Sequence, residues 1–373
     1  MRKAPGDRCG RLRHDVDVTT RAILIRLCSA LLLGALLAAP AAPALAEKPG
    51  IPYKVGIRQV EFHDTKYGDR TLALAVFYPA DLGDKEPVPF KMPFYVGLDL
   101  YKDAAIAASD KPYPLIMLSH GRGSNPLLYA WLAQLLASHG YIVAGPYHHR
   151  ANTYDATIAY LANKLWQRPV DVSLLITHLL GDPAWGKAID PERIGVTGHS
   201  QGGFTSLWMG GAKVNRDKYL AFQQGWHNNK MVPAHLRDAL PLDPGPALDV
   251  ADPRIKAVFS MAPGIVKAFG MDEAGLAELK VPTYLTVGAR DTQTPAADNA
   301  EFAAKHIAGA ELWIIPGKVD HEIFTNECDQ EGKDEFPEGC IDAEGVDRAA
   351  IHREIGAAAL KFFAAHLKGA ATP

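Results

Sequence analysis

The chain has 373 residues, of which 48% are hydrophobic and 22% are charged. This composition supports a sizeable buried core and excludes a globally disordered chain. Lysine and arginine number 39 against 42 aspartate and glutamate, and the resulting net charge of −3 argues against a protein held on nucleic acid by bulk charge. At roughly 100–200 residues per domain, the length allows one large domain or two small ones.

The first 46 residues have the layout of a signal peptide with a polar N-terminal extension. Residues 27–46 carry no charge, arginines precede this apolar stretch, and it ends in the small-residue pattern 44–46. A basic region, an apolar region and a cleavage site in this order are typical of a segment removed on export. We predict cleavage after Ala46, a periplasmic or secreted protein and no stable membrane anchor. The alternative is an uncleaved anchor, because about 20 apolar residues can span a bilayer.

Export leaves two of the four cysteines, Cys328 and Cys340, in an oxidising compartment. We therefore predict a disulfide between them, closing a loop of low apolar content. Two unpaired thiols are the alternative. A zinc site is less favoured, because two cysteines without a nearby Cys/His pair leave a tetrahedral site incomplete. We expect no metal and no cofactor.

Strand and helix patterns alternate along the rest of the chain. Strands are predicted at 55–62, 71–78, 114–119, 141–144, 193–197, 255–261, 283–287 and 312–315, and helices at 127–138, 170–180, 202–209, 296–307 and 349–367. Such alternation predicts right-handed βαβ units and a mostly parallel sheet with helices on both faces. Residues 213–254 break the rhythm and are predicted to form an excursion over the active-site edge of the sheet. Residues 47–373 are thus expected to form a single α/β domain.

The strongest chemical signal is the sequence Gly198-His-Ser200-Gln-Gly202. It has the G-x-S-x-G pattern of a nucleophile elbow, with a predicted strand directly before it and a predicted helix directly after it. The glycines relieve the crowding of such a sharp turn. The serine hydroxyl is then raised at the carboxyl end of the sheet, above a helix N-terminus that favours negative charge. We predict that Ser200 is a nucleophile.

A serine nucleophile needs a base, and the base needs an orienting carboxylate. In the chain order Ser, acid, His, the residues after two later strands are Asp291 and His321. Both are predicted at the same sheet edge as Ser200. The alternatives are Asp298 and Asp320 for the acid, and His306 and His352 for the base, although the two histidines lie in helices predicted to face away.

Two backbone N–H groups should stabilise the oxyanion of the transition state. One belongs to Gln201, which follows the nucleophile, and the other to Arg122, in the glycine-containing loop 119–123. His120 is expected to hydrogen-bond within this loop and to transfer no proton. The pair at 148–149 follows another strand end and is expected to line the pocket more readily than to bind a metal.

These segments together resemble the α/β-hydrolase superfamily. Within it, the chain is similar to an exported group of predicted dienelactone hydrolases that is related to the platelet-activating-factor acetylhydrolases. The resembling stretches are 114–123, 135–144, 193–203, 288–291 and 316–321. The resemblance implies a serine esterase that cleaves a small-molecule carboxylic ester through an acyl-enzyme. It implies the triad Ser200, Asp291 and His321, the oxyanion donors Arg122 and Gln201, and an excursion that carries Cys328 and Cys340 after the histidine.

The chain departs from this pattern at two places. True dienelactone hydrolases use a cysteine nucleophile where Ser200 stands, and a bulky cation occupies position 122 where an apolar residue is expected. A thioesterase, amidase or acyltransferase would use the same triad and is the first alternative function. The second is a non-catalytic binding protein on the hydrolase fold, which the intact set of three residues disfavours.

Overall fold

The computed structural model describes residues 52–84, 86–161, 164–230, 233–238 and 249–368. The predicted signal segment 1–46 lies outside the described residues. Contacts group Glu47–Pro373 into one compact unit. Within the described ranges, no helix is both long enough and apolar enough to cross a membrane.

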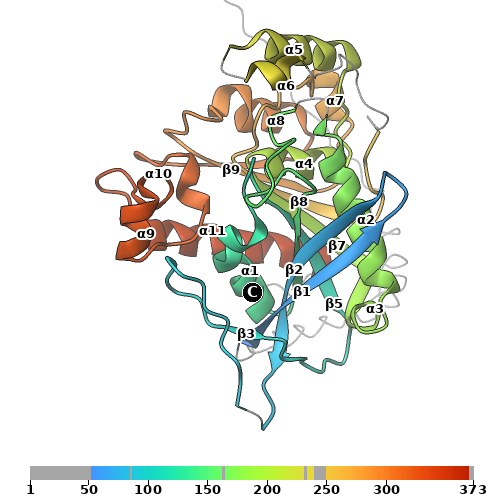
Figure 1. Ribbon diagram of the computed structural model, residues 1–373, viewed down its shortest axis with the longest axis vertical. Helices are drawn as coiled ribbons and strands as arrows, with labels where there is room; N and C mark the ends of the chain where they lie inside the picture. Colours follow the sequence, from blue (N-terminus) through green and yellow to red (C-terminus); the bar gives the residue numbers. More distant parts are fainter. Residues whose placement is uncertain (1–51, 85, 162–163, 231–232, 239–248, 369–373) are drawn as a thin grey trace, which may run out of the picture. The chain divides into compact units, whose positions relative to one another are not determined.

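One mixed sheet forms the centre of the described chain, with the strand order β10-β9-β8-β7-β5-β6-β2-β1-β3 and β4 paired to β2 (Figure 1). The strands are β1 Lys54–Asp64, β2 Arg70–Asp81, β3 Leu100–Lys102, β4 Ala105–Ile106, β5 Tyr113–Ser119, β6 Ile142–Tyr147, β7 Ile189–His199, β8 Ile255–Met261, β9 Thr283–Gly288 and β10 Glu311–Ile315. Strand β2 runs antiparallel to β1 and β6, whereas β5 to β10 are parallel to their neighbours among themselves. The carboxyl ends of β5, β7, β9 and β10 therefore open on one edge.

The helices follow the strands as the alternating pattern predicts. They are α1 Ala130–Ser138, α2 Gln167–Gly181, α3 Trp185–Ala188, α4 Gln201–Gly210, α5 Arg216–Asn228, α6 Ala234–Asp238, α7 Glu273–Ala277, α8 Ala300–His306, α9 Gln330–Glu335, α10 Pro337–Cys340 and α11 Arg348–Phe363. Three 3₁₀-helical segments are η1 Pro126–Tyr129, η3 Ala296–Asp298 and η4 His321–Phe324, and η5 Ala364–Lys368 is a π-helical segment that follows α11. The expected α/β fold class is confirmed.

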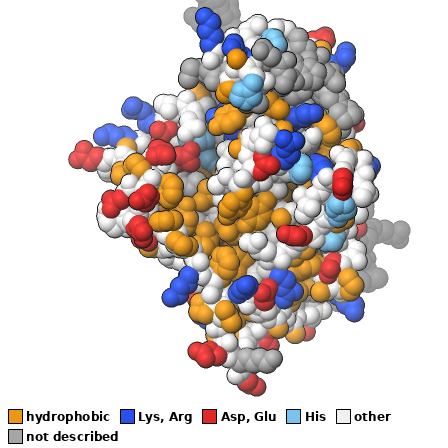
Figure 2. All heavy atoms as spheres, viewed as in Figure 1, with side chains coloured by type: hydrophobic (Ala, Val, Ile, Leu, Met, Phe, Trp, Pro, Cys, Tyr) orange, Lys and Arg blue, Asp and Glu red, His pale blue; other side chains and the backbone are white. Residues whose placement is uncertain are grey.

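The short helices α9 and α10 form a polar lobe beside the sheet (Figure 1). Their sequences are rich in acidic residues and contain few apolar ones. Figure 2 shows acidic side chains gathered on this side of the molecule. The lobe has little core of its own, so its order depends on covalent and polar anchors.

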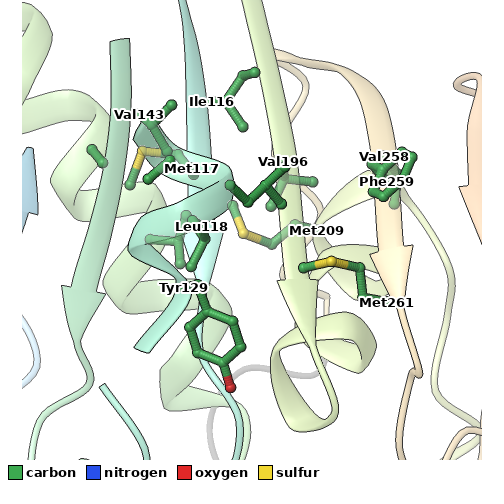
Figure 3. Packing of buried hydrophobic residues seen from close by; sticks show 14 of the residues in the cluster. Ile116, Met117, Leu118, Tyr129, Val143, Val196, Met209, Val258, Phe259 and Met261 are labelled. Atoms are coloured by element: carbon green, nitrogen blue, oxygen red, sulfur yellow. The ribbon is translucent and has the colours of Figure 1, made fainter. Parts of the chain in front are cut away.

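Helices cover both faces of the sheet, as neighbouring core residues show. In β8, Val258 faces Gly210 of α4, and the next residue, Phe259, packs its ring against Phe362 and Phe363 of α11. Consecutive residues of a strand point to opposite faces, so α4 and α11 lie on opposite sides of the sheet. Figure 3 shows this apolar core, with Tyr129 at the end where the parallel strands finish. The core thus fixes the strand ends that carry the candidate site.

The prediction of one continuous helix at 296–307 is wrong. The segment divides at Asn299, whose backbone has φ −128° and ψ −92°, into η3 and α8. The Asn299 side chain accepts from the N–H of Val266 and donates to the carbonyl of Pro295. These contacts with residues outside the segment replace the regular helical pattern there.

The described part of the excursion 213–254 consists mainly of α5 and α6. In α5, the rings of Tyr219 and Phe222 pack edge-on against Phe269, at centroid distances of 4.7 and 5.3 Å. Burial of these rings holds α5 against the segment that follows β8. Residues 231–232 and 239–248 lie outside the described ranges.

Candidate active site

The turn between β7 and α4 has the strained geometry of a nucleophile elbow. Ser200 has φ 58° and ψ −119°, a conformation that non-glycine residues rarely adopt. A β-carbon on Gly202 would overlap the carbonyl of Ser119, and one on Gly198 would overlap the carbonyl of Gly202. Close backbone approach therefore requires glycine at both flanks of the serine.

The two predicted oxyanion donors border one cavity with Ser200. The N–H of Gly121 donates to the Tyr129 hydroxyl at 3.2 Å and so is already used. The N–H groups of Arg122 and Gln201 make no hydrogen bond with any residue that the structure describes. These two groups are therefore available to a ligand in the cavity.

Asp291 and His321 meet at the same edge of the sheet. Asp291 follows β9 and His321 begins η4 after β10, and their Oδ2 and Nδ1 atoms are 2.7 Å apart. Thr294 supports the carboxylate: its N–H donates to Oδ1 at 2.7 Å and its hydroxyl to Oδ2 at 2.8 Å. Both oxygens of the buried carboxylate are thus hydrogen-bonded, and it can orient the imidazole.

The surroundings of Asp291 favour its ionised form. Burial by itself would raise the pKa of this carboxyl, but the hydrogen bond and charge of His321, with the two bonds from Thr294, outweigh burial and hold the pKa below its ordinary value. A carboxylate that stays charged can stabilise an imidazolium on His321. This is the electrostatic arrangement that general-base catalysis needs.

The cavity has a volume of about 420 Å³, within the range of small-molecule sites. Ser200 and His321 both line it, together with the oxyanion donors and mostly small or polar side chains. Thr153 contributes from the loop after β6, whereas no described residue of 213–254 lines it. The described residues of the excursion do not reach the cavity itself, because α5 packs on Phe269, in the segment that follows β8.

Two comparisons with known proteins bear on this geometry. Residues 91–175 match the family model described as platelet-activating factor acetylhydrolase, isoform II. This segment contains the Arg122 loop and ends before Ser200. A structure titled as a ferulic acid esterase from Streptomyces cinnamoneus is similar at a TM-score of 0.57 and 23% identity, over 90% of this chain and 94% of that one.

The chain has the α/β-hydrolase fold. The α/β-hydrolase fold predicted from the sequence is confirmed. The matched family is described as an acetylhydrolase and the similar structure as an esterase, and both names agree with the serine ester hydrolase expected from the sequence.

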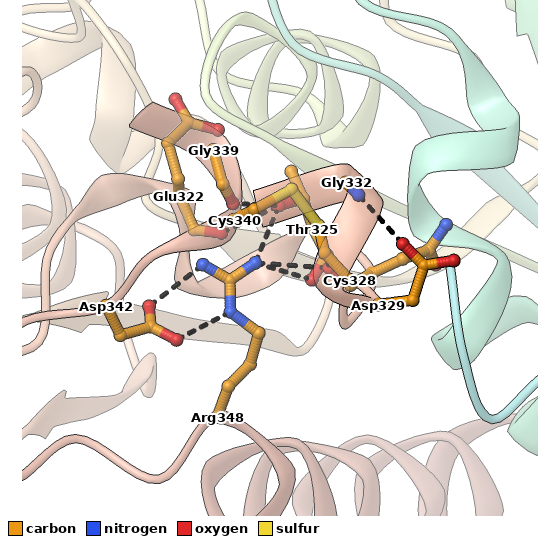
Figure 4. The surroundings of a disulfide bond; sticks show 10 residues. Glu322, Thr325, Cys328, Asp329, Gly332, Gly339, Cys340, Asp342 and Arg348 are labelled. Carbon is orange, nitrogen blue, oxygen red and sulfur yellow. Dashed lines mark hydrogen bonds and ion pairs between the residues drawn. A yellow bond between two sulfur atoms is a disulfide. The ribbon is translucent and has the colours of Figure 1, made fainter. Parts of the chain in front are cut away.

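A dense set of contacts fixes the segment that follows His321. Arg348 of α11 donates to Thr325 and to the carbonyl of Asn326, and its guanidinium pairs with Asp342 (Figure 4). The predicted disulfide Cys328–Cys340 is confirmed, with the two Cα atoms 5.5 Å apart. The disulfide links the polar lobe of α9 and α10 to the same segment.

The alternative acids, Asp298 and Asp320, lie elsewhere. Asp298 forms an exposed ion pair with Lys267 at 3.3 Å. Asp320 accepts from the backbone N–H groups of Thr292 and His321. Neither carboxylate reaches the imidazole nitrogen that faces Asp291.

The alternative bases are held by other contacts. The ring of His306 lies against Phe302 of α8, at a centroid distance of 4.8 Å. His352 stacks on Trp131 at 3.8 Å, and its Nε2 lies 2.7 Å from the carbonyl oxygen of Ile323. Both histidines therefore take part in packing outside the cavity.

His120 and His148 belong to a buried network of hydrogen bonds beneath the loop 119–123. His120 Nδ1 lies 2.7 Å from the Gly121 carbonyl, as expected for a loop contact. The expectation that His148 lines the active-site cavity is wrong: its Nε2 lies 2.9 Å from Ser119 Oγ and its Nδ1 3.2 Å from Asp171. Burial is the largest cause that lowers the pKa of both histidines well below the ordinary value. No cluster of potential metal ligands occurs among the described residues.

Four residues near the site are not among the sequence candidates: Tyr129, His199, Thr294 and Arg168. His199 lies inside the G-x-S-x-G motif, so its position marks it, but its partners come from distant segments. The buried Arg168 donates to the carbonyl of His120. Thr294 is identified by its bonds to Asp291, three residues away, whereas only long-range contacts identify Tyr129 and Arg168.

Proposed function

We propose that the protein is a serine hydrolase that cleaves carboxylic esters of small molecules through an acyl-enzyme. The observation that supports this most is the 2.7 Å contact between Asp291 and His321, at a cavity that Ser200 also lines. The esterase names of the similar family and structure support the same reaction. No cofactor or metal has a role in the proposed mechanism.

In the proposed mechanism, Ser200 Oγ attacks the ester carbonyl carbon and its proton passes to Nε2 of His321. Asp291 holds Nδ1, fixes the tautomer and stabilises the imidazolium. The N–H groups of Arg122 and Gln201 donate to the oxyanion. The intermediate then collapses, the leaving alcohol takes the proton from His321, and a water molecule activated by the same histidine releases the acid.

A fluorophosphonate probe and a graded series of p-nitrophenyl esters test this function. The wild-type protein should label at Ser200 and hydrolyse the esters. Ser200→Ala should not label, and its kcat should fall by about 10⁴–10⁶-fold. A wild-type protein that neither labels nor hydrolyses any ester would instead favour the non-catalytic alternative. A panel that adds thioesters and amides, with product analysis, separates the remaining activities.

We further propose that the enzyme acts after export, as a periplasmic or secreted protein. The charge-free stretch 27–46 and the disulfide Cys328–Cys340 support this, because disulfides persist in oxidising compartments. Mass spectrometry of the native protein should find Glu47 at its N-terminus. A native chain that retains residues 1–46 would reject the cleavage.

A further inference from the structure

A chain of buried hydrogen bonds crosses the floor of the candidate site. The N–H of Gly121 donates to the Tyr129 hydroxyl at 3.2 Å. That hydroxyl lies 3.0 Å from Nδ1 of His199, and Nε2 of His199 lies 3.0 Å from the carbonyl oxygen of His321. Tyr129, His199 and His321 are all buried. The chain joins loops that follow three different strands, β5, β7 and β10.

The bonding partners determine which atom donates in each hydrogen bond of this series. A carbonyl oxygen only accepts, so Nε2 of His199 carries a hydrogen and donates it to His321. In the neutral ring, Nδ1 is then an acceptor, and the hydrogen between it and Tyr129 belongs to the tyrosine. The tyrosine oxygen in turn accepts from Gly121. Each group therefore has its complementary partner, and reversing one bond would break the next.

Burial keeps both side chains in the required protonation states. It is the largest cause that lowers the pKa of His199 well below the ordinary value, and the neighbouring His321 adds to it. The His199 and His321 rings are in contact, with centroids 4.4 Å apart, so only one of them can readily carry charge. Burial also raises the pKa of Tyr129 to about 12, and the hydroxyl keeps its proton.

Two members of this hydrogen-bond chain directly precede groups that the reaction uses. Gly121 directly precedes the oxyanion donor Arg122, and His199 directly precedes the nucleophile Ser200. We infer that Tyr129 and His199 are positioning residues, which hold the oxyanion loop and the backbone of His321 in register with Ser200. The inference rests on the proposed ester hydrolysis and adds two residues to its machinery.

The packing around Gly121 leaves little room for an alternative arrangement. A β-carbon on Gly121 would lie 3.2 Å from the Tyr129 hydroxyl, 3.5 Å from Ser200 Cβ and 3.6 Å from His199 Nδ1. Loss of the Tyr129 hydroxyl would therefore leave the Gly121 N–H and His199 Nδ1 buried without partners. Displacements of about 1 Å at reacting groups can lower the rate 100-fold. Loss of these hydrogen bonds should therefore slow the reaction.

The first test compares Tyr129→Phe with Tyr141→Phe. Tyr141 is a matched control, because it is also a buried tyrosine and its hydroxyl has no hydrogen-bond partner among the residues that the structure describes. Tyr129→Phe should lower kcat and the rate of fluorophosphonate labelling by about 10- to 100-fold, with KM changed much less. Tyr141→Phe should leave both rates unchanged.

The second test compares two substitutions of His199 and then combines one of them with Tyr129→Phe in a double-mutant cycle. His199→Gln can keep an N–H donor toward His321, and His199→Leu cannot, so the glutamine variant should retain more activity than the leucine variant. Because Tyr129 and His199 act through one chain, the double variant Tyr129→Phe/His199→Leu should be no slower than the slower single variant. Melting temperatures of all variants report any loss of fold separately from the rates.

Two outcomes would overturn the positioning role. One is a Tyr129→Phe variant with the rates of Tyr141→Phe, and the other is a cycle in which the logarithms of the rate losses add. Both outcomes are measured against a wild-type protein that labels with the probe and hydrolyses esters. A wild-type protein without either activity would instead refute the proposed function.

Discussion

Gly202 and Ser119 are in backbone contact: no β-carbon fits on Gly202 without overlapping the Ser119 carbonyl oxygen. Gly202 belongs to α4, and Ser119 is the last residue of β5 and the first of the loop 119–123 that carries Arg122. The close approach brings the N–H of Gln201 and the N–H of Arg122 to the same cavity. The second glycine of the motif therefore has a packing role that is separate from the serine chemistry.

Gly202→Ala should destabilise the protein by about 3 kcal/mol or more, because the backbone of β5 must move to admit the methyl group. Gly225→Ala in α5 is the control, since nothing lies within 4 Å of a β-carbon there. That change should stabilise by about 0.5–1 kcal/mol, as alanine is the better helix residue. Urea unfolding of both variants measures the difference, and equal effects would contradict the overlap.

Asp291→Asn should lower kcat by about 10³–10⁴-fold while the protein remains folded, because an amide cannot stabilise the imidazolium of His321 and can favour the wrong tautomer. Asp298→Asn is the matched control, since Asp298 is an exposed carboxylate paired with Lys267. Its kcat should stay close to the wild-type value. Comparable losses in the two variants would reject Asp291 as the orienting acid.

Replacement of Cys328 and Cys340 by serine should destabilise the protein by about 3 kcal/mol, the loop-closure entropy for a sequence separation of 12. Activity at moderate temperature should persist, because Arg348 still holds Thr325 and Asn326. Denaturant unfolding and ester hydrolysis on the same samples test both statements. Loss of activity without loss of stability would mean that the disulfide itself positions His321.

His352 should make stability depend on pH. Burial, the largest cause, lowers its pKa to about 4, although the hydrogen bond to Ile323 opposes the shift. The unfolded chain then binds more protons between about pH 4 and the ordinary value of 6.5. Its contribution is therefore full above pH 6.5 and is lost as the pH falls toward about 4.

His352→Phe keeps a ring on Trp131 but removes the titrating group. Its free energy of unfolding should vary less with pH over this window, by up to about 1.4 kcal/mol per pH unit. Urea titrations at several pH values compare the two slopes. Parallel slopes would show that His352 does not contribute. The buried His120, His148 and His199 remain in both proteins and leave a residual dependence.

The amino-acid sequence alone predicted the fold class, the main sheet strands and the Gly198-to-Gly202 elbow. These are local features: apolar runs encode buried strands, and a sharp turn between strand and helix demands glycine wherever it occurs. It also singled out Asp291 and His321, because chain order and strand ends limit the possible positions. Their catalytic roles stay predictions that the variants above test.

Which side chains meet follows from the folded arrangement and not from local sequence. Asp291, Asp298 and Asp320 are similar in sequence context, and the register of β9 beside β10 selects the one that reaches His321. Tyr129 and His199 gain their significance from contacts 70 and 122 residues apart along the chain. The break at Asn299 and the placement of α5 on Phe269 likewise depend on distant partners. Such contacts arise from packing of whole elements, and no local residue pattern encodes them.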